Sequence, residues 1–145
     1  MASTIHLAPL VGSAAPQRPP AQPTILCIDD DPEIHTGLAL RMAEYHVHVE
    51  HAYYGEQGIS DALETRPDLI ITDVRMPGGD GKDLIQAIRT QASTIAVPII
   101  VLTGVRDPAL RARLRSAGAD AFLQKPVPVA QLIQLMETFI ELRRA

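Results

Sequence analysis

The sequence has one cysteine in 145 residues and lacks any long apolar run. A single cysteine excludes an intramolecular disulfide, and the place of Cys27 inside a short apolar stretch predicts a small core residue in a reducing compartment. No segment approaches the roughly 20 apolar residues of a membrane span, and the N-terminus lacks the features of a signal peptide. The net charge of −4 does not favour a nucleic-acid binder. We expect a cytoplasmic protein that binds neither membranes nor nucleic acid directly.

Prolines are concentrated at the start of the chain. Five of the 12 fall within residues 1–23, amid alanine, serine and glutamine. Such a composition buries too little apolar surface to order itself, so we expect a disordered tail there. The remaining length suits one domain, over residues 24–145.

After the tail, five apolar runs alternate with five amphipathic segments. The runs are TILCI (24–28), HVHVEH (46–51), DLIITD (68–73), PIIVLT (98–103) and AFLQK (121–125), and we expect helices over residues 34–45, 56–65, 82–91, 108–117 and 128–144. This alternation predicts an α/β fold, a doubly wound, flavodoxin-like (βα)5 unit with parallel strands in the order 2-1-3-4-5. The second run alternates valine with histidine and glutamate, which suits an edge strand.

Polar side chains stand where the central runs end. They are Asp29, Asp30 and Asp31 after the first run, Asp73 at the end of the third, Thr103 at the end of the fourth and Lys125 at the end of the fifth. In such sheets the carboxyl ends of the strands share one edge, where ligands bind. Two carboxylates about 4 Å apart repel by roughly 4 kcal/mol at an effective dielectric near 20, so the acid cluster predicts a bound cation. Acids, a hydroxyl and one ammonium together predict a site for Mg²⁺ and a phosphoryl group.

Asp31 has a different predicted role from its two neighbours. It precedes Pro32 and Glu33, which is the pattern of a helix N-cap, a proline in the first turn and an acid at the positive helix end. Asp29 and Asp30 are then the pair that faces the site.

The ordered motifs ILCIDD, PDLIITDVRMPGGDG, PIIVLTG and FLQKP resemble the receiver domain of two-component response regulators. The resemblance spans about residues 24–142. It implies that Asp73 accepts a phosphoryl group from a phosphohistidine on a histidine kinase or a histidine phosphotransfer protein. It also implies that Asp30, Asp73 and the backbone carbonyl of Arg75 hold Mg²⁺, with Asp29 reaching the ion mainly through water.

The resemblance further implies how the signal would leave the site. Lys125 and Thr103 would contact the phosphoryl group, and Thr103 and Phe122 would shift together to remodel the face made by residues 108–117, 121–125 and 128–144. A downstream protein would bind this face of a monomer or weak homodimer. The domain would also hydrolyse its own aspartyl phosphate, at a rate tuned by Arg75 and Val105, and would otherwise not be an enzyme. A cis Lys125–Pro126 bond is a further expectation.

Two other functions remain open on the sequence. A haloacid-dehalogenase-like phosphatase would use Asp29 as nucleophile and Asp31 as general acid. It would also need an acidic pair after the lysine to bind magnesium, but the only acids after Lys125 are Glu137 and Glu141, both within a predicted helix, and Asp73 would have no role. A non-phosphorylated interaction module would have no reason to gather acids at one edge.

Two further functions are not supported. Dinucleotide binding is not, because no glycine-rich turn follows the first run. A metal site at the histidines of the second run is not, because a solvated edge strand explains them better. The sequence does not decide between a stand-alone regulator and part of a larger protein.

Overall fold

A central sheet of five parallel strands organises the part of the chain that the structure describes. The strands are β1 (Thr24–Ile28), β2 (His48–Ala52), β3 (Leu69–Thr72), β6 (Ile99–Thr103) and β7 (Ala121–Gln124), hydrogen-bonded in the order β2-β1-β3-β6-β7. This is the predicted order, with the histidine-rich strand at an edge. The computed structural model describes residues 22–76 and 79–145. The expected tail, residues 1–23, lies outside the described residues except for its last two positions.

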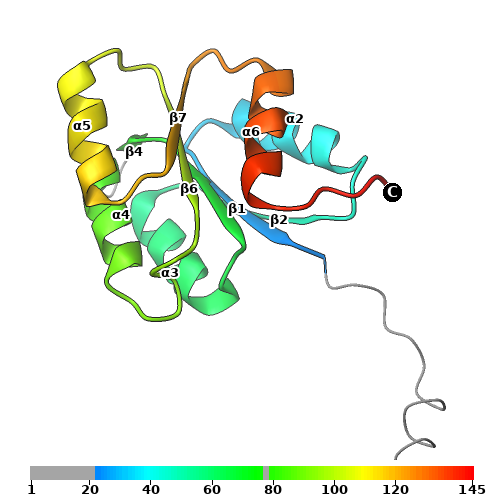
Figure 1. Cartoon of the computed structure of the whole chain (residues 1–145), viewed down its shortest axis with the longest axis horizontal. Helices are drawn as coiled ribbons and strands as arrows, with labels where there is room; N and C mark the ends of the chain where they lie inside the picture. The colour runs from blue at the N-terminus through cyan, green and yellow to red at the C-terminus, as the bar shows by residue number, and fades with distance from the viewer. Residues whose placement is uncertain (1–21, 77–78) are drawn as a thin grey trace, which may run out of the picture.

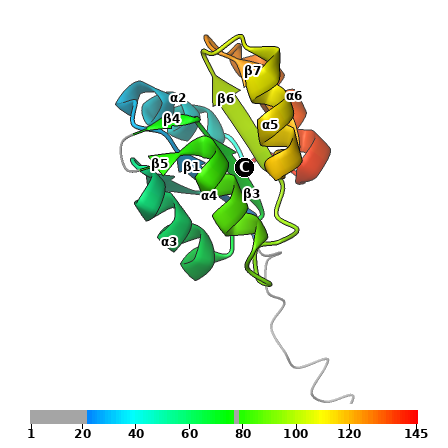
Figure 2. The same ribbon diagram turned by 90° about the vertical axis from the view of Figure 1, so that its left-hand side faces the viewer.

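Within these residues, five helices cover the two faces of the sheet (Figure 1). They are α2 (Pro32–Met42) and α6 (Val129–Phe139) on one face, and α3 (Gly55–Thr65), α4 (Gly81–Arg89) and α5 (Pro108–Ala117) on the other. Figure 2 shows α3, α4 and α5 in front of the sheet. Because successive strand residues point to opposite faces, Leu26 and Ile28 pack under α3, α4 and α5, whereas Ile25 and Cys27 pack under α2 and α6.

Helices α2 and α5 both begin with an aspartate N-cap followed by a proline. The Asp31 carboxylate accepts a hydrogen bond from the Glu33 amide at 2.9 Å, and the Asp107 carboxylate accepts one from the Ala109 amide at 2.9 Å. Each aspartate satisfies one free amide of the first turn, and the proline that follows has no N–H to satisfy. The predicted capping role of Asp31 is confirmed.

The C-terminal helix is shorter than the sequence predicts. The apolar pattern suggested a helix to Arg144, but α6 ends at Phe139 and Ile140 has an extended backbone (φ −136°, ψ 158°). The chain beyond it pairs with the segment after α2: the Arg143 carbonyl accepts from the His46 amide at 2.7 Å, and Arg144 bridges to Tyr45. These backbone hydrogen bonds replace the ones that another helical turn would provide.

A short antiparallel hairpin follows Asp73, where no strand is expected from the sequence. It consists of β4 (Arg75–Met76) and β5 (Gly79–Asp80). At its base the Gly81 amide donates to the Val74 carbonyl at 3.0 Å. A Cβ on Gly81 would lie 2.8 Å from the Val74 Cα, so this close backbone approach requires glycine.

Arg89, at the end of α4, ties two loops to the helix through its guanidinium. The group donates to the carbonyls of Val97 at 2.6 Å and of Gly118 at 2.8 and 3.1 Å, and to the Asp120 carboxylate at 2.9 Å. The group also donates to the carbonyls of Thr94 at 3.3 Å and of Ile95 at 3.1 Å. One side chain therefore satisfies backbone acceptors on both sides of β6.

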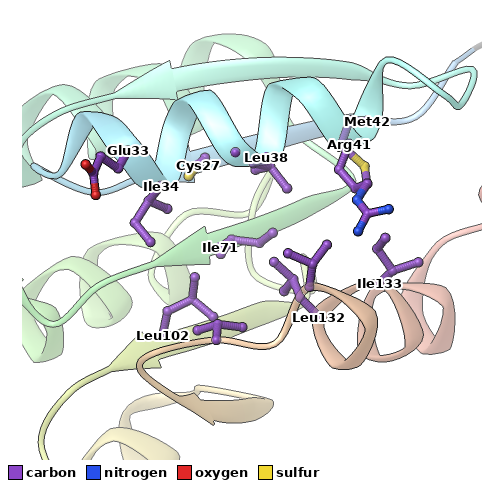
Figure 3. A pocket seen from close by; sticks show the side chains of 13 residues that line it. Cys27, Glu33, Ile34, Leu38, Arg41, Met42, Ile71, Leu102, Leu132 and Ile133 are labelled. Atoms are coloured by element: carbon purple, nitrogen blue, oxygen red, sulfur yellow. The ribbon is translucent and has the colours of Figure 1, made fainter.

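A mostly apolar cleft of about 170 Å³ lies between α2 and α6 (Figure 3). Cys27, Ile71 and Leu102 of the sheet line it together with helix side chains that include Leu38 and Leu132. Cys27 is fully buried, as the sequence predicts. Burial, with a smaller effect of the nearby Asp29 charge, raises the pKa of its thiol to about 12, so the thiol stays protonated.

Two helical glycines differ in the space around them, and they predict opposite effects of alanine. A Cβ on Gly58 would lie 2.7 Å from the Ile28 Cδ1, whereas one on Gly37 would meet nothing within 4 Å. Gly58→Ala should lower the free energy of unfolding by about 1–3 kcal/mol through overpacking. Gly37→Ala should raise it by about 0.5–1 kcal/mol through helix propensity. Urea unfolding of both variants measures this, and equal shifts of one sign would contradict the packing of α3 on β1.

Candidate functional site

Three strand ends bring two acids and an amine together at the carboxyl edge of the sheet. The Lys125 ammonium, just after β7, donates to the Asp29 carboxylate at 3.0 Å and to the Asp73 carboxylate at 2.8 Å. Asp29 follows β1 and Asp73 follows β3. The aligned parallel register places these ends side by side, as the sequence predicted.

The acids differ in their exposure. Carboxylate oxygens of Asp29, Asp30 and Asp73 lie within 4.8 Å of one another. Asp29 and Asp73 are buried, at 1% and 9% exposure, whereas Asp30 is exposed. Three oxygen donors around one point, two of them inside the protein, form a group that suits a hard divalent cation.

Backbone amides orient both buried carboxylates. Asp29 Oδ1 accepts from the Asp31 amide at 2.9 Å, and Asp73 Oδ1 accepts from the amides of Val74 at 2.6 Å and Arg75 at 3.3 Å. The second oxygen of each carboxylate accepts from Lys125. Both groups are therefore fixed before any ligand arrives, which lowers the reorganisation needed for binding.

Burial and charge act against each other in this cluster. Burial raises the pKa of Asp29, although the Asp31 amide and Lys125 favour its ionised form. Burial lowers the pKa of Lys125, but the hydrogen bonds and charges of Asp73 and Asp29 outweigh it, so the pKa lies above its ordinary value. Lys125 is thus a permanent cation near neutral pH, beside two buried acids.

The remaining predicted residues lie around this centre. Thr103 is buried at the end of β6, and its hydroxyl oxygen accepts from the Val105 amide at 3.0 Å. Phe122 lies on β7, with the guanidinium groups of Arg111 and Arg115 at 5.7 and 5.1 Å from its ring centre. In the part of the chain that the structure describes, no hydrogen bond joins the side chain of Thr103 or Phe122 to the three acids.

Two further features border the site. Arg75 is exposed and begins β4, directly beyond the Asp73 cluster. The Lys125–Pro126 bond is cis, as expected.

Sequence reasoning missed His35, which is 3% exposed on α2. Its Nε2 lies 2.7 Å from the Asp29 backbone carbonyl, and its Nδ1 lies 2.7 Å from Nδ1 of His51 on β2. Burial, and then the neighbouring His35, lower the pKa of His51. The six residues from Asp29 to His35 are a short loop and one helical turn, a spacing that allows the contact between His35 and the Asp29 carbonyl. Nothing in the sequence indicates that His51 turns inward to meet His35.

The model of the response regulator receiver domain matches residues 25–137. The chain belongs to this family. Two solved structures share the receiver fold. The chemotaxis protein CheY4 of Vibrio cholerae is 29% identical with a TM-score of 0.76, covering 83% of this chain and 100% of that one. The receiver domain of the sensor histidine kinase PA1611 of Pseudomonas aeruginosa, with a magnesium ion coordinated in its active-site cleft, is 29% identical with a TM-score of 0.74, covering 82% and 98%.

The transcriptional regulatory protein PrrA of Mycobacterium leprae is 32% identical over 127 residues, which cover 86% of this chain and 53% of that protein. This receiver domain spans about half the length, or less, of the first curated relatives it matches. Receiver domains are signalling modules of two-component systems, and the acidic site fits a phosphoacceptor.

The phosphatase alternative is not favoured, because Asp31 caps α2 and Asp73 stands in the centre of the site. Every helix of residues 22–76 and 79–145 is too short or too polar to cross a bilayer.

Proposed function

We propose that this receiver domain is a switch in which Asp73 accepts a phosphoryl group from the phosphohistidine of a histidine kinase or histidine phosphotransfer protein. One observation carries the proposal. A single ammonium, Lys125, lies within hydrogen-bonding distance of Asp29 and Asp73 while Asp30 stands exposed beside them. This arrangement combines a carboxylate nucleophile, a positive charge and an exposed acidic ligand in one place.

The donor set fits Mg²⁺. The Asp30 carboxylate accepts no hydrogen bond from the described residues, so its oxygens are free to bind an ion, and Asp73 and Asp29 stand next to it. Asp30, Asp73 and the Arg75 backbone carbonyl would hold the ion, with Asp29 acting mainly through water. When bound, Mg²⁺ supplies positive charge for the phosphoryl oxygens and reduces repulsion among the acids.

In the transfer step an Asp73 oxygen forms a bond to phosphorus as the bond from phosphorus to the donor imidazole nitrogen breaks, and the imidazole keeps the electron pair. The Val74 amide holds the Asp73 carboxylate in place during the attack. Lys125 would turn from Asp73 to the new phosphoryl group. The Thr103 hydroxyl would donate to the same group from the end of β6.

The output would pass through the face of α5, β7 and α6. Phe122 belongs to this face and lies under two arginines of α5, so a shift of Thr103 towards the phosphoryl group would change its packing. A downstream protein would recognise the changed face of a monomer or weak homodimer. Phosphoryl transfer would take place in the cytoplasm, where kinases have ATP. The only reactions that the domain catalyses would be its own phosphorylation and dephosphorylation.

Arg75 and Val105 would set the lifetime of the aspartyl phosphate. Arg75 is exposed two residues beyond Asp73. In that place a long side chain would restrict the access of water to the aspartyl phosphate. Arg75→Asn should therefore speed the loss of phosphate several-fold, because a shorter side chain leaves more room for the attacking water. Decay of the phosphorylated protein, followed by intact mass after removal of the donor, measures this. An unchanged decay rate would remove the role of Arg75.

The test of the proposed function uses the full chain with Mg²⁺ and acetyl phosphate, or with beryllium fluoride as a phosphoryl mimic. We expect one added phosphoryl group by intact mass, dependent on Mg²⁺ and lost with a chelator. With beryllium fluoride, backbone amide shifts should change at the site and on the face of α5, β7 and α6. Absence of both responses in a folded, Mg²⁺-loaded sample would refute the proposal.

A further inference from the structure

His35 connects α2 to the backbone that carries the acid pair. It lies on the first turns of α2 and is almost completely buried. One ring nitrogen lies 2.7 Å from the Asp29 carbonyl oxygen, and the other lies 2.7 Å from His51 on the edge strand. The ring also packs on Tyr53, with 4.2 Å between ring centres. None of these contacts belongs to the phosphoryl chemistry described above.

We propose that His35 is a positioning residue for the metal site: it fixes the Asp29–Asp30 peptide so that the Asp30 carboxylate faces the Mg²⁺ position. The proposal rests on the proposed function, because it assumes that Asp30 is a metal ligand.

The protons in this contact follow from the partners. A carbonyl oxygen only accepts, so His35 Nε2 carries the hydrogen and donates it to Asp29. In the neutral ring Nδ1 is then an acceptor, and His51 donates to it. The Asp29 carbonyl thus sets the tautomer of the ring, and His51 satisfies the second nitrogen of this buried side chain.

The bond matters for Asp30 because no hydrogen bond or ion pair from the described part of the chain holds the Asp30 side chain directly. The Asp29 amide donates to the Ala52 carbonyl at 3.0 Å, and the Asp29 carboxylate is held by the Asp31 amide and Lys125. The Asp29 carbonyl belongs to the planar peptide that joins Asp29 to Asp30. Its direction therefore sets the orientation of this peptide, and with it the direction of the Asp30 side chain. Without the His35 donor the buried carbonyl loses its partner, and the peptide is free to rotate towards water.

The decisive comparison is between His35→Leu and His35→Gln. Leucine has no donor, whereas the amide nitrogen of glutamine reaches about as far as Nε2 and restores the bond to Asp29. Titration of the full chain with Mg²⁺ alone, followed by backbone amide shifts, gives the dissociation constant of the folded protein. We expect His35→Leu to bind Mg²⁺ about tenfold more weakly, the lower end of the effect of losing a group that orients a ligand. His35→Gln should bind close to wild type.

Two controls separate positioning from general stability. His51→Leu removes the partner of Nδ1 but keeps the donor to Asp29, so its urea midpoint should fall while its Mg²⁺ affinity stays near wild type. His48→Leu changes an exposed histidine of the same strand and should alter neither. His35→Met, also without a donor, replaces the leucine variant where that variant does not fold.

The outcomes distinguish the two proposals. Equal Mg²⁺ affinity in wild type and His35→Leu, with only the urea midpoint lowered, would overturn the positioning role and leave the proposed function intact. Failure of the wild-type chain to bind Mg²⁺, or unchanged Mg²⁺ binding in Asp30→Asn, would overturn the metal site itself and the role of His35 with it.

Discussion

Asp73→Asn should abolish phosphorylation of this receiver domain completely. The amide is close in shape to the carboxylate and should keep the hydrogen bond from the Val74 amide, but its weakly nucleophilic oxygen does not form the phosphoryl bond. Lys125 keeps its bond to Asp29, so the fold should survive. Intact mass after incubation with Mg²⁺ and acetyl phosphate should show one added phosphoryl group on wild type and none on the variant.

Asp29→Asn provides the matched control, because it changes the other buried acid that contacts Lys125. It should slow phosphorylation through weaker Mg²⁺ binding without removing the acceptor. The phosphatase alternative predicts the reverse pattern: steady turnover of a phosphate ester that Asp29→Asn abolishes and Asp73→Asn leaves unchanged. Phosphorylation of the Asp73→Asn protein at wild-type level would refute Asp73 as the acceptor.

Arg89→Met should lower the free energy of unfolding by about 3 kcal/mol, because carbonyls on two loops lose a charged donor. The guanidinium contacts the carbonyls of Val97 and Gly118 and the Asp120 carboxylate, with only 18% of the side chain exposed. Methionine keeps much of the aliphatic packing but donates no hydrogen bond. The urea midpoint should fall by roughly 1–3 M, given the usual dependence of unfolding on urea for a domain of this size.

Arg113→Met is the control for Arg89→Met. Arg113 is exposed on α5, and no hydrogen bond or ion pair joins it to the described residues. The same substitution there should change the free energy of unfolding by less than about 0.5 kcal/mol. Similar losses for both variants would show that the guanidinium contacts of Arg89 do not stabilise the fold.

The strand order and the acid site could be predicted because both depend on side-chain identity. Continuous apolar runs mark strands that are covered on both faces, and the polar residue that ends each run falls at a common edge. For this reason the predicted positions of Asp29, Asp73 and Lys125 agree with the structure. The residues that follow Asp31 indicate its role as the helix cap.

Other features were missed because they depend on backbone atoms or on register. The contacts of Arg89 are mostly to carbonyls, which every residue has and no sequence pattern marks. The burial of His35 depends on the register that turns His51 towards α2. At the C-terminus Ile140 and Leu142 continue an apolar pattern, but pairing of Arg143 with His46 ends the helix at Phe139. Tertiary hydrogen bonds overrode local propensity in that segment.

The chain contributes its reactive groups from widely separated positions. Lys125 contacts Asp29, 96 residues earlier, and Asp73, 52 residues earlier. It directly follows β7, the last strand of the sheet in chain order. Such distant contacts form only when the intervening chain has been organised. A nascent or partly unfolded molecule therefore has no assembled acceptor, so phosphorylation of this domain would report that its sheet has formed as far as β7.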